Sequence, residues 1–323
     1  MIKFTFKDVG QGDSIIIEWE DDTKGIAIVD CNLYKGKNVV IEHIIKENIK
    51  HIDLIVLSHP HYDHFSGMFD LLSYCLNNKI TINRFYHTCD VVPDRLRSAV
   101  KGKYINTELH KLFKFIVDNS KKMNIKTGSI SSDLEVILSL SKDYKLSFLS
   151  PSNKEINDFI RGSVYNLDEE SDGNNPKANV LSTVIKVETP EGYILLTADT
   201  PKTSLVRIDT RTPDEIKGTL LLGQAPHHGA GSSVNHSNAF WKKRNRKNQT
   251  PIVFSVGSNG YGHVSKDPVD FFITNDYDLY ATNQEGALTS ISTRNISTAL
   301  NAYSLLLSPK NGKFQGDQIF QFK

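Results

Sequence analysis

The sequence predicts a mixed α/β protein in which two β-rich halves, each flanked by helices, form a layered sandwich. Short apolar segments with strand character alternate along the chain with segments of helical periodicity. One of these strands, at residues 54–57, ends abruptly in a loop rich in metal ligands, and a similar order of strands and helices returns in the second half. With 323 residues, 39% of them hydrophobic and 23% charged, the chain can bury a sizeable core. We expect a single domain over residues 1–323.

The first half is expected to form a layered unit that ends at the ligand loop. A glycine-rich turn separates the first two strands, and an acidic turn follows the second. Apolar residues at helical spacing precede the strand at 54–57, and longer periodic segments follow the ligand loop. The expected strands are residues 2–6, 14–19, 25–30, 54–57 and 146–149, and the expected helices lie around residues 39–45, 65–77 and 104–122.

The second half is expected to repeat this style without a visible sequence repeat. Its apolar runs are short and bounded by turn residues, which favours strands, and two segments have helical spacing. The residues from about 293 to 323, which include an apolar run at 302–307, are expected to form a terminal extension that adds one or two strands. The expected strands are residues 180–187, 193–197, 219–222, 252–256, 279–282 and 288–291, and the expected helices are residues 237–243 and 268–275.

The loop after residues 54–57 carries four metal-ligand side chains in six residues: His59, His61, Asp63 and His64. The chain has only 11 histidines, so three of them at fixed spacing are poorly explained as chance surface residues. We expect His59 and His61 to share one ion while Asp63 and His64 turn towards a second. Imidazole and carboxylate ligands together suit zinc or manganese.

This loop fits the HxHxDH motif of the metallo-β-lactamase fold, and further motifs follow in the order of that family. Together they resemble the soluble hydrolase domain of ComEC-type DNA-uptake proteins, and phosphorylcholine esterases of the same fold carry a similar series. The resemblance spans about residues 2–291 and implies an αββα sandwich. The glycine-rich segment is then a strand connection whose Asp13 supports the ligand loop. The motifs are residues 8–14 (DVGQGDS), 195–199 (LLTAD), 226–229 (PHHG) and 261–263 (YGH).

The resemblance implies roles for residues of the second half. Asp199 ends an apolar strand, where the family's aspartate bridges the two metal ions; the alternative is a helix N-cap ahead of Thr200-Pro201. His227 and His228 follow another strand, and one of them is expected to complete the second ion's ligands. The sequence leaves the choice open; we select His228 as the ligand and His227 as a substrate contact or supporting donor.

The first ion lacks an obvious third histidine. Many members of the fold supply one from the segment before the bridging aspartate, but no histidine occurs between His110 and Asp199. Asn179 stands where ComEC-like chains often have asparagine, so we expect a weak first site, one that prefers manganese, or one completed by water and Asn179. His87 could substitute only if its strand enters the site, and we expect it to be structural.

The expected function is phosphodiester hydrolysis of nucleic acid or nucleotides by a metal-bound hydroxide, with two divalent ions as cofactors. Asp63, His227 and His263 are the predicted catalytic residues, and His263 lies in a flexible turn suited to protonating a leaving oxygen or binding phosphate. Three alternatives stay open: hydrolysis of a small phosphodiester such as a cyclic nucleotide or a choline phosphoester, attack on a β-lactam or thioester carbonyl, and a metal-stabilised or effector module of a larger assembly such as a defence system.

Charge and cysteine content add context. A net charge of +1 gives no overall attraction to nucleic acid, but residues 242–247 place five cations together, either as a phosphate grip or as a solvated loop. The three cysteines form no CxxC pair and favour a reducing compartment, so we expect a cytoplasmic protein. No apolar run has the length of a membrane helix, and the first residues alternate like a strand rather than a leader. Protein partners are not predicted.

Overall fold

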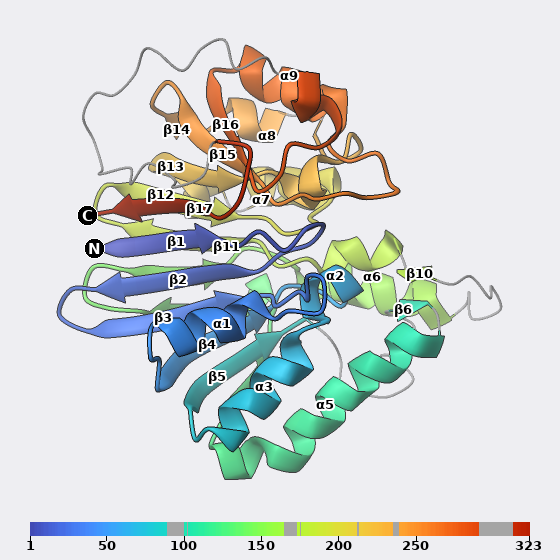
Figure 1. The fold of residues 1–323 in the computed structure, drawn as a ribbon. Helices are drawn as coiled ribbons and strands as arrows, with labels where there is room; N and C mark the ends of the chain where they lie inside the picture. The colour runs from blue at the N-terminus through green and yellow to red at the C-terminus, as the bar shows by residue number, and fades with distance from the viewer. Residues whose placement is uncertain are drawn as a thin grey trace.

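In a computed structural model of the chain, two β-sheets face each other and helices cover their outer faces (Figure 1). This arrangement confirms the predicted α/β sandwich. The structure describes residues 1–323 except 89–99, 102, 165–172, 175, 212, 235–238 and 291–312. Among the described residues, no helix is long and apolar enough to cross a membrane.

The first sheet has seven strands in the order β17-β1-β2-β3-β4-β5-β7. β17, β1, β2 and β3 pair in antiparallel fashion, whereas β3, β4, β5 and β7 are parallel to one another. The strands are β1 (Ile2–Phe6), β2 (Ile15–Glu20), β3 (Lys24–Val29), β4 (His51–Leu57), β5 (Thr81–His87), β7 (Lys126–Ser129) and β17 (Gln318–Phe322).

The second sheet has eight strands. Seven follow the order β16-β15-β13-β12-β11-β9-β8, and β14 pairs with β13. β12, β13, β15 and β16 run parallel, whereas β8, β9 and β11 pair in antiparallel fashion. The strands are β8 (Ile137–Ser139), β9 (Lys145–Phe148), β11 (Ile185–Thr189), β12 (Gly192–Leu196), β13 (Thr219–Gln224), β14 (Asn245–Arg246), β15 (Thr250–Phe254) and β16 (Tyr277–Ala281); a separate pair is formed by β6 (Val100–Lys101) and β10 (Gly173–Asn174).

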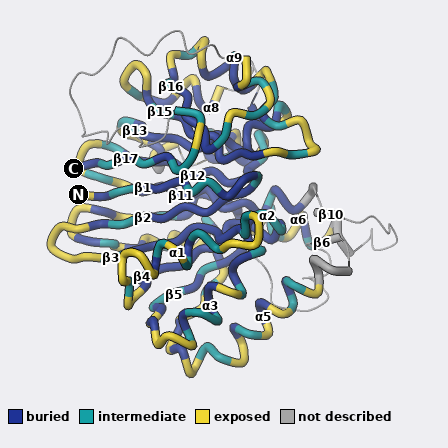
Figure 2. The backbone as a smooth tube through the Cα atoms, viewed as in Figure 1, coloured by how far each residue is buried: buried dark blue, intermediate teal, exposed yellow. Residues whose placement is uncertain are grey.

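Alternation along the strands builds the layers. In β4, Leu54 and Val56 belong to the apolar cluster between the two sheets, whereas Ile55 and Leu57 belong to the cluster beneath the helices. Successive side chains of a strand point to opposite faces, so a strand buried on both sides has to be apolar throughout. Buried backbone accordingly follows the strands through the middle of the molecule (Figure 2). The free thiols Cys31 and Cys75 lie in the helix-side core.

Helices cover both outer faces. Residues of α1, α3 and α5 pack in the cluster on the first sheet, and residues of α7, α8 and α9 pack in the cluster on the second. The α-helices are α1 (Val39–Lys46), α2 (Tyr62–Phe65), α3 (Met68–Asn77), α5 (Lys103–Met123), α6 (Asn153–Val164), α7 (Lys202–Arg211), α8 (Ala239–Lys242) and α9 (Lys266–Thr274), and the 3-10 helices are η1 (Ser132–Leu134), η2 (Pro176–Leu181), η3 (Pro213–Ile216), η4 (Pro226–Gly229) and η5 (Gly286–Ser290).

Two sequence-based strands are wrong in part or whole. Residues 288–291 were expected to be a strand, but the described part lies in the 3-10 helix η5, where Leu288 alone is buried against the second sheet's helices. The strand expected at 180–187 begins only at Ile185, because η2 occupies residues 176–181. One terminal strand, β17, is present beyond residue 293, whereas the run at 302–307 lies outside the described residues.

The carboxyl ends of the parallel strands meet at one edge of the sandwich. β3 and β4 of the first sheet are followed by Asp30 and by the ligand loop, and β12 and β13 of the second are followed by Asp199 and by His227-His228. Parallel strands end at a common edge, where α/β folds usually bind their ligands. The two sheets therefore bring residues from distant parts of the sequence to one place.

Candidate metal centre

The ligand loop leaves β4 at Ser58 and turns into the short helix α2. His59 is fully buried directly after the strand, His61 is the N-cap residue of α2, and Asp63 and His64 lie within the helix. His61 and His64 are also buried, whereas the Asp63 side chain is 23% exposed. The loop therefore presents three sheltered imidazoles and one carboxylate that solvent can reach.

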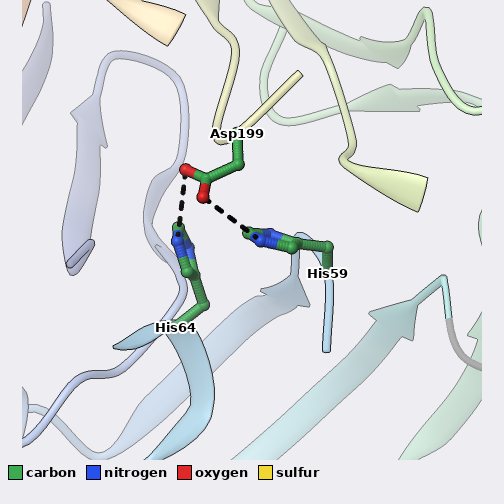
Figure 3. Close-up of side chains that lie close together, drawn as sticks. All are labelled: His59, His64 and Asp199. Carbon is green, nitrogen blue, oxygen red and sulfur yellow. Dashed lines mark ion pairs between the residues drawn. The ribbon is translucent and has the colours of Figure 1, made fainter. Parts of the chain in front are cut away.

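The two carboxylate oxygens of Asp199 face different imidazoles (Figure 3). Its Oδ2 lies 3.6 Å from Nε2 of His59, and its Oδ1 lies 3.4 Å from Nε2 of His64. His228 Nε2 is 3.1 Å from the same Oδ1 and 3.5 Å from Oδ2 of Asp63. The side chain is therefore aimed into the cluster, as a bridging ligand would be, rather than used as a helix cap.

Hydrogen bonds fix which nitrogen of each imidazole faces Asp199. His64 Nδ1 lies 2.7 Å from Oδ2 of Asp30, and His228 Nδ1 lies 2.7 Å from the carbonyl oxygen of Ser255. Both oxygens are acceptors, so each Nδ1 carries the proton and donates it. Nε2 of His64 and of His228 then faces the carboxylate, and in the neutral ring this nitrogen carries the lone pair that can bind metal.

His59 is oriented through a relay that starts from the same aspartate. The Ser58 hydroxyl donates to Oδ2 of Asp30 over 2.6 Å, which leaves its oxygen to accept from Nδ1 of His59 at 3.1 Å. The Nε2 lone pair of His59 is thereby turned to Asp199. Five polar atoms of this cluster are buried without a hydrogen-bond partner. They are Nε2 of His59, His64 and His228 and one carboxylate oxygen each of Asp63 and Asp199.

The spacing of these atoms fits a divalent ion. Zinc–ligand distances of about 2.0–2.1 Å in a tetrahedron put ligand atoms about 3.3–3.4 Å apart. Oδ1 of Asp199 lies 3.1 Å from Nε2 of His228 and 3.4 Å from Nε2 of His64. Nε2 of His228 lies 3.5 Å from Oδ2 of Asp63. Imidazole nitrogens and carboxylate oxygens at these distances need a proton or a metal cation between them, and the separations fit a metal ion.

Burial and charge act in opposite directions on these groups. Burial and the neighbouring charge of His64 lower the pKa of His59 to about 4. Burial also works against the protonated form of His64 and His228, but Asp199 and the other carboxylates outweigh it and raise both pKa values. The pKa of Asp199 is held well below its usual range by His228, His227 and His64, despite its burial. The cluster thus attracts positive charge strongly.

Backbone conformation in the second sheet's loops is unusual. Ala198, His227 and His228 have φ values of 43°, 50° and 51°, in the left-handed region that costs non-glycine residues free energy. The amide of His227 donates to the carbonyl of Ala198 over 2.9 Å, so the two loops hold each other. Gln224 adds a second tie, because its Oε1 accepts from the amides of Thr197 and Ala198 at 2.9 and 3.0 Å.

The glycine-rich connection after β1 supports the ligand loop from behind. The amide of Asp13 donates to the carbonyl of Asp63 over 3.1 Å, and the Asp13 carboxylate accepts from Nε2 of Gln224 over 2.8 Å. Gly12 has φ 125°, and a Cβ there would lie 2.2 Å from the carbonyl oxygen of Asp63. Only glycine allows the backbone to approach Asp63 this closely. The glycine-rich connection therefore packs behind the ligand loop, where it was expected to support that loop.

The remaining predicted residues fall in different places. The four groups of described side chains whose ligand atoms lie within 4.8 Å of one another contain neither His61 nor His87. The His61 ring nevertheless lies beside that of His59, with centroids 4.5 Å apart. His87 packs edge-on against Phe113 at 4.9 Å, in keeping with a structural role. Asn179 Nδ2 lies 3.5 Å from Nε2 of His227, which itself lies 3.5 Å from Oδ2 of Asp199.

His263 faces the cluster from the loop after β15. Its ring centroid is 5.1 Å from that of His227, and its neighbour Tyr261 is 74% exposed. Asn259 braces the loop, since its Oδ1 accepts from the amide of His263 over 3.0 Å. Burial and the charges of His227 and His228 lower the pKa of His263 to about 4, so the ring is neutral at pH 7. A neutral ring can donate a hydrogen bond from one nitrogen.

The basic run at residues 242–247 is largely used within the fold. Lys243 and the buried Arg244 both pair with Asp209, and Arg246 donates to the carbonyl of Asn275 while lying over the Tyr277 ring. Three of the five cations of the proposed phosphate grip are therefore engaged in structural contacts, which favours neither a free basic patch nor a solvated loop.

Sequence reasoning missed the residues that orient the ligands: Asp30, Ser58, Gln224 and Ser255. Asp30 and Ser255 each follow a strand whose carboxyl end lies at the ligand edge, and that position is the one signal that could have singled them out. Ser58 directly precedes the ligand loop. Gln224 gives no such signal, because a buried glutamine at a strand end is informative only once its partners are known.

A comparison with protein-family models finds a similarity over part of the chain. Residues 8–87 match the family model of the metallo-beta-lactamase superfamily. The match covers the glycine-rich connection and the ligand loop. A search of curated proteins finds no match to the chain.

Solved structures with a similar arrangement are remote in sequence. Zinc-bound PqqB from Methylobacterium extorquens is 10% identical over 87% of this chain and 98% of its own, with a TM-score of 0.48. Tm1679, a metal-dependent hydrolase of the beta-lactamase superfamily, is 13% identical over 87% and 96%, with a TM-score of 0.46. The metallo-beta-lactamase fold protein YhfI from Bacillus subtilis is 10% identical over 87% and 95%, with a TM-score of 0.44.

Proposed function

We propose that this protein is a metal-dependent hydrolase of phosphodiesters, acting on nucleic acid or nucleotides. One observation carries the proposal: the Nε2 atoms of His59, His64 and His228 converge on the two oxygens of Asp199 at separations that fit a metal ion. The proposed ligands are His59 and His61 for the first ion, Asp63, His64 and His228 for the second, and Asp199 for both.

Two divalent ions, zinc or manganese, would supply a water acidic enough to act as a nucleophile at neutral pH and positive charge beside the reacting phosphate. Asp63 is the one carboxylate of the cluster that solvent reaches, so it is placed to accept a hydrogen bond from the attacking water. The neutral His263 is placed to donate a hydrogen bond to a phosphate or leaving-group oxygen, because its ring lies over the cluster from the exposed loop.

The choice of phosphodiesters rests on the resemblance of the motifs to the ComEC hydrolase domain and to phosphorylcholine esterases. A small phosphodiester is the second candidate substrate, and the structure gives it one specific argument. Because Lys243, Arg244 and Arg246 are engaged within the fold, the basic run offers less charge to a polymer backbone than its sequence suggests. A cytoplasmic location belongs to the same proposal, since the two described cysteines are free thiols.

The test is a substrate panel with protein loaded with manganese or zinc. Single- and double-stranded DNA and RNA would report nuclease activity, and bis-p-nitrophenyl phosphate would report small-diester activity. Asp63→Ala should abolish whichever activity is found, and Asp70→Ala, which changes an exposed carboxylate on α3, is the matched control. Turnover of the small diester alone would favour the second candidate. No turnover of any diester would contradict both and leave the non-catalytic module.

A further inference from the structure

Three rings follow one another from the buried cluster to the solvent. His228 is buried, His263 is half-buried and Tyr261 is 74% exposed. The ring centroids of His228 and His263 are 6.5 Å apart, with an interplanar angle of 29°. Those of His263 and Tyr261 are 5.9 Å apart, with an angle of 36°. Tyr261 therefore stands at the outer end of a row of rings that begins at the candidate metal centre.

Most of the Tyr261 ring is not used by the fold. Of the large hydrophobic side chains that are exposed in the described part of the chain, Tyr261 is the most exposed and the only aromatic one. Its one ring contact with another described residue is the tilted approach to His263. An aromatic ring offers a large apolar face, and here that face stays open to a ligand.

Asn259 fixes the loop that carries this ring. Its Oδ1 accepts from the amides of Tyr261 and His263 at 3.1 and 3.0 Å, and its Nδ2 donates to the carbonyl of His263 at 2.7 Å. A Cβ added at Gly260 or Gly262 would meet no heavy atom within 4 Å, so the space beside the loop is open. The backbone under the ring is thus held before a ligand arrives, which lowers the entropic cost of binding.

We infer that Tyr261 stacks on the base of a nucleotide whose phosphate lies at the metal centre, and that it thereby selects diesters that carry a base. The inference rests on the proposed function and names the substrate class of the same site. A base is separated from its phosphate by one sugar, so a phosphate bound over the cluster places its base outward of His263, on the side of Tyr261. Stacking on an aromatic side chain needs one open face and tolerates any base.

A single open ring favours a flat base over a quaternary ammonium group. Quaternary ammonium ligands such as choline are typically held in cages of several aromatic rings. Within the described residues, His263 is the one ring that contacts Tyr261, so no such cage is formed. The structure therefore favours a nucleotide over a choline phosphoester.

The first experiment measures binding by calorimetry to manganese-loaded protein, with adenosine 5′-monophosphate and ribose 5-phosphate as probes. The probes share sugar and phosphate and differ in the base. Wild-type protein should bind the nucleotide about 5–150-fold more tightly, the range that stacking of one base provides. Tyr261→Ala should remove this preference by weakening the nucleotide alone, whereas Tyr261→Phe should keep it. Ser258→Ala, which changes an exposed side chain of the same loop, is the matched control and should bind both probes as wild type does.

Kinetics extend the test to the reaction. With a dinucleoside phosphodiester as substrate, Tyr261→Ala should raise KM by a similar factor and change kcat little, because the stack is present in both the ground state and the transition state. With the abasic analogue of the same diester, the loss should disappear. Glycerophosphocholine is the third substrate, and it reports a choline subsite.

The outcomes separate the inference from the proposed function. Equal affinity of wild-type protein for the two probes, or a preference that survives in Tyr261→Ala, would overturn the inference while the hydrolase proposal stands. So would equal weakening of both probes, which would indicate a structural role, and a loss confined to glycerophosphocholine, which would indicate a choline subsite. A loss in Tyr261→Phe as large as that in Tyr261→Ala would assign the contact to the hydroxyl and overturn stacking. If wild-type protein hydrolysed no diester, the proposed function would fail, and the affinities of the two probes would decide the inference by themselves.

Discussion

The two sheets contribute their proposed site residues in different ways. The first sheet contributes four from one turn at residues 59–64, which continues into a helix of ordinary geometry. The second contributes Asp199, His227-His228 and His263 from three separate loops, and three residues there have left-handed backbone. A contiguous motif positions itself through local structure, whereas scattered ligands depend on hydrogen bonds between loops. The second half should therefore be more sensitive to changes outside the ligands.

Asp199→Ala should have the largest effect, because it removes the one side chain that both groups of imidazoles face. We expect both ions to be lost and activity on the best diester to fall on the order of 10³-fold or more. Elemental analysis and initial rates measure this. His59→Ala is the comparison, and it should leave one ion bound. Retention of two ions by Asp199→Ala would mean that the halves hold metal independently.

Gln224→Met tests the ties between loops of the second half. It leaves the amides of Thr197 and Ala198 and the carboxylate of Asp13 without their partner in a buried place. The free energy of unfolding should fall by about 3 kcal/mol, since each unsatisfied buried group costs about 1–3 kcal/mol. Urea unfolding of metal-free protein measures it. Gln284→Met, which removes one longer hydrogen bond to Leu288, should cost far less. If the two variants lost equal unfolding free energy, the hydrogen bonds of Gln224 would have no special importance for the second half.

Asp30→Asn tests the first half in the same manner. Asparagine tolerates the left-handed backbone at this position but cannot accept from Nδ1 of His64 and from Ser58 as a carboxylate does. Affinity for the second ion should fall about 10–100-fold, and the free energy of unfolding should also fall, because buried donors lose an acceptor. Zinc titration with a competing chelator measures the change. Asp70→Asn, on the exposed face of α3, should leave the affinity unchanged.

Much of the first half could be predicted because its determinants are local. Strand β1 has the expected bounds, and the ligand loop can be recognised because its ligand residues are close together in the sequence. The second half was harder. Residues 288–291 alternate like a strand, yet Leu288 is the anchor of a 3-10 turn. The roles of Asp30, Gln224 and Ser255 depend on strands that are distant in sequence and end side by side in the fold. Hydrophobic periodicity predicts strands and helices but not which of them become neighbours.

Glu18→Gln should have the smallest effect on the free energy of unfolding. It tests how much a charged residue of the first sheet, outside the site, contributes to stability. Burial raises the pKa of Glu18, but hydrogen bonds from His43 and Lys3 outweigh burial and bring it to about 2. Because the folded-state value lies below the ordinary one, the carboxylate stabilises the fold fully above about pH 4.5, and this contribution disappears as the pH falls through 2. Urea unfolding at pH 7 and pH 2.5 should show that the small difference between wild type and variant narrows with acid. A constant difference would contradict the assignment.

The pairing of β17 with β1 has a practical consequence. Because Ile2 lies opposite Phe322 in an antiparallel register, the first and last described residues emerge together, at the end of β1 remote from the connection that leads to Asp13 (Figure 1). Any segment joined before residue 1 or after residue 323 would leave the sandwich on the side away from the imidazoles. Attachment to a surface or to a fluorescent label through either end should therefore keep Asp63 and His263 accessible.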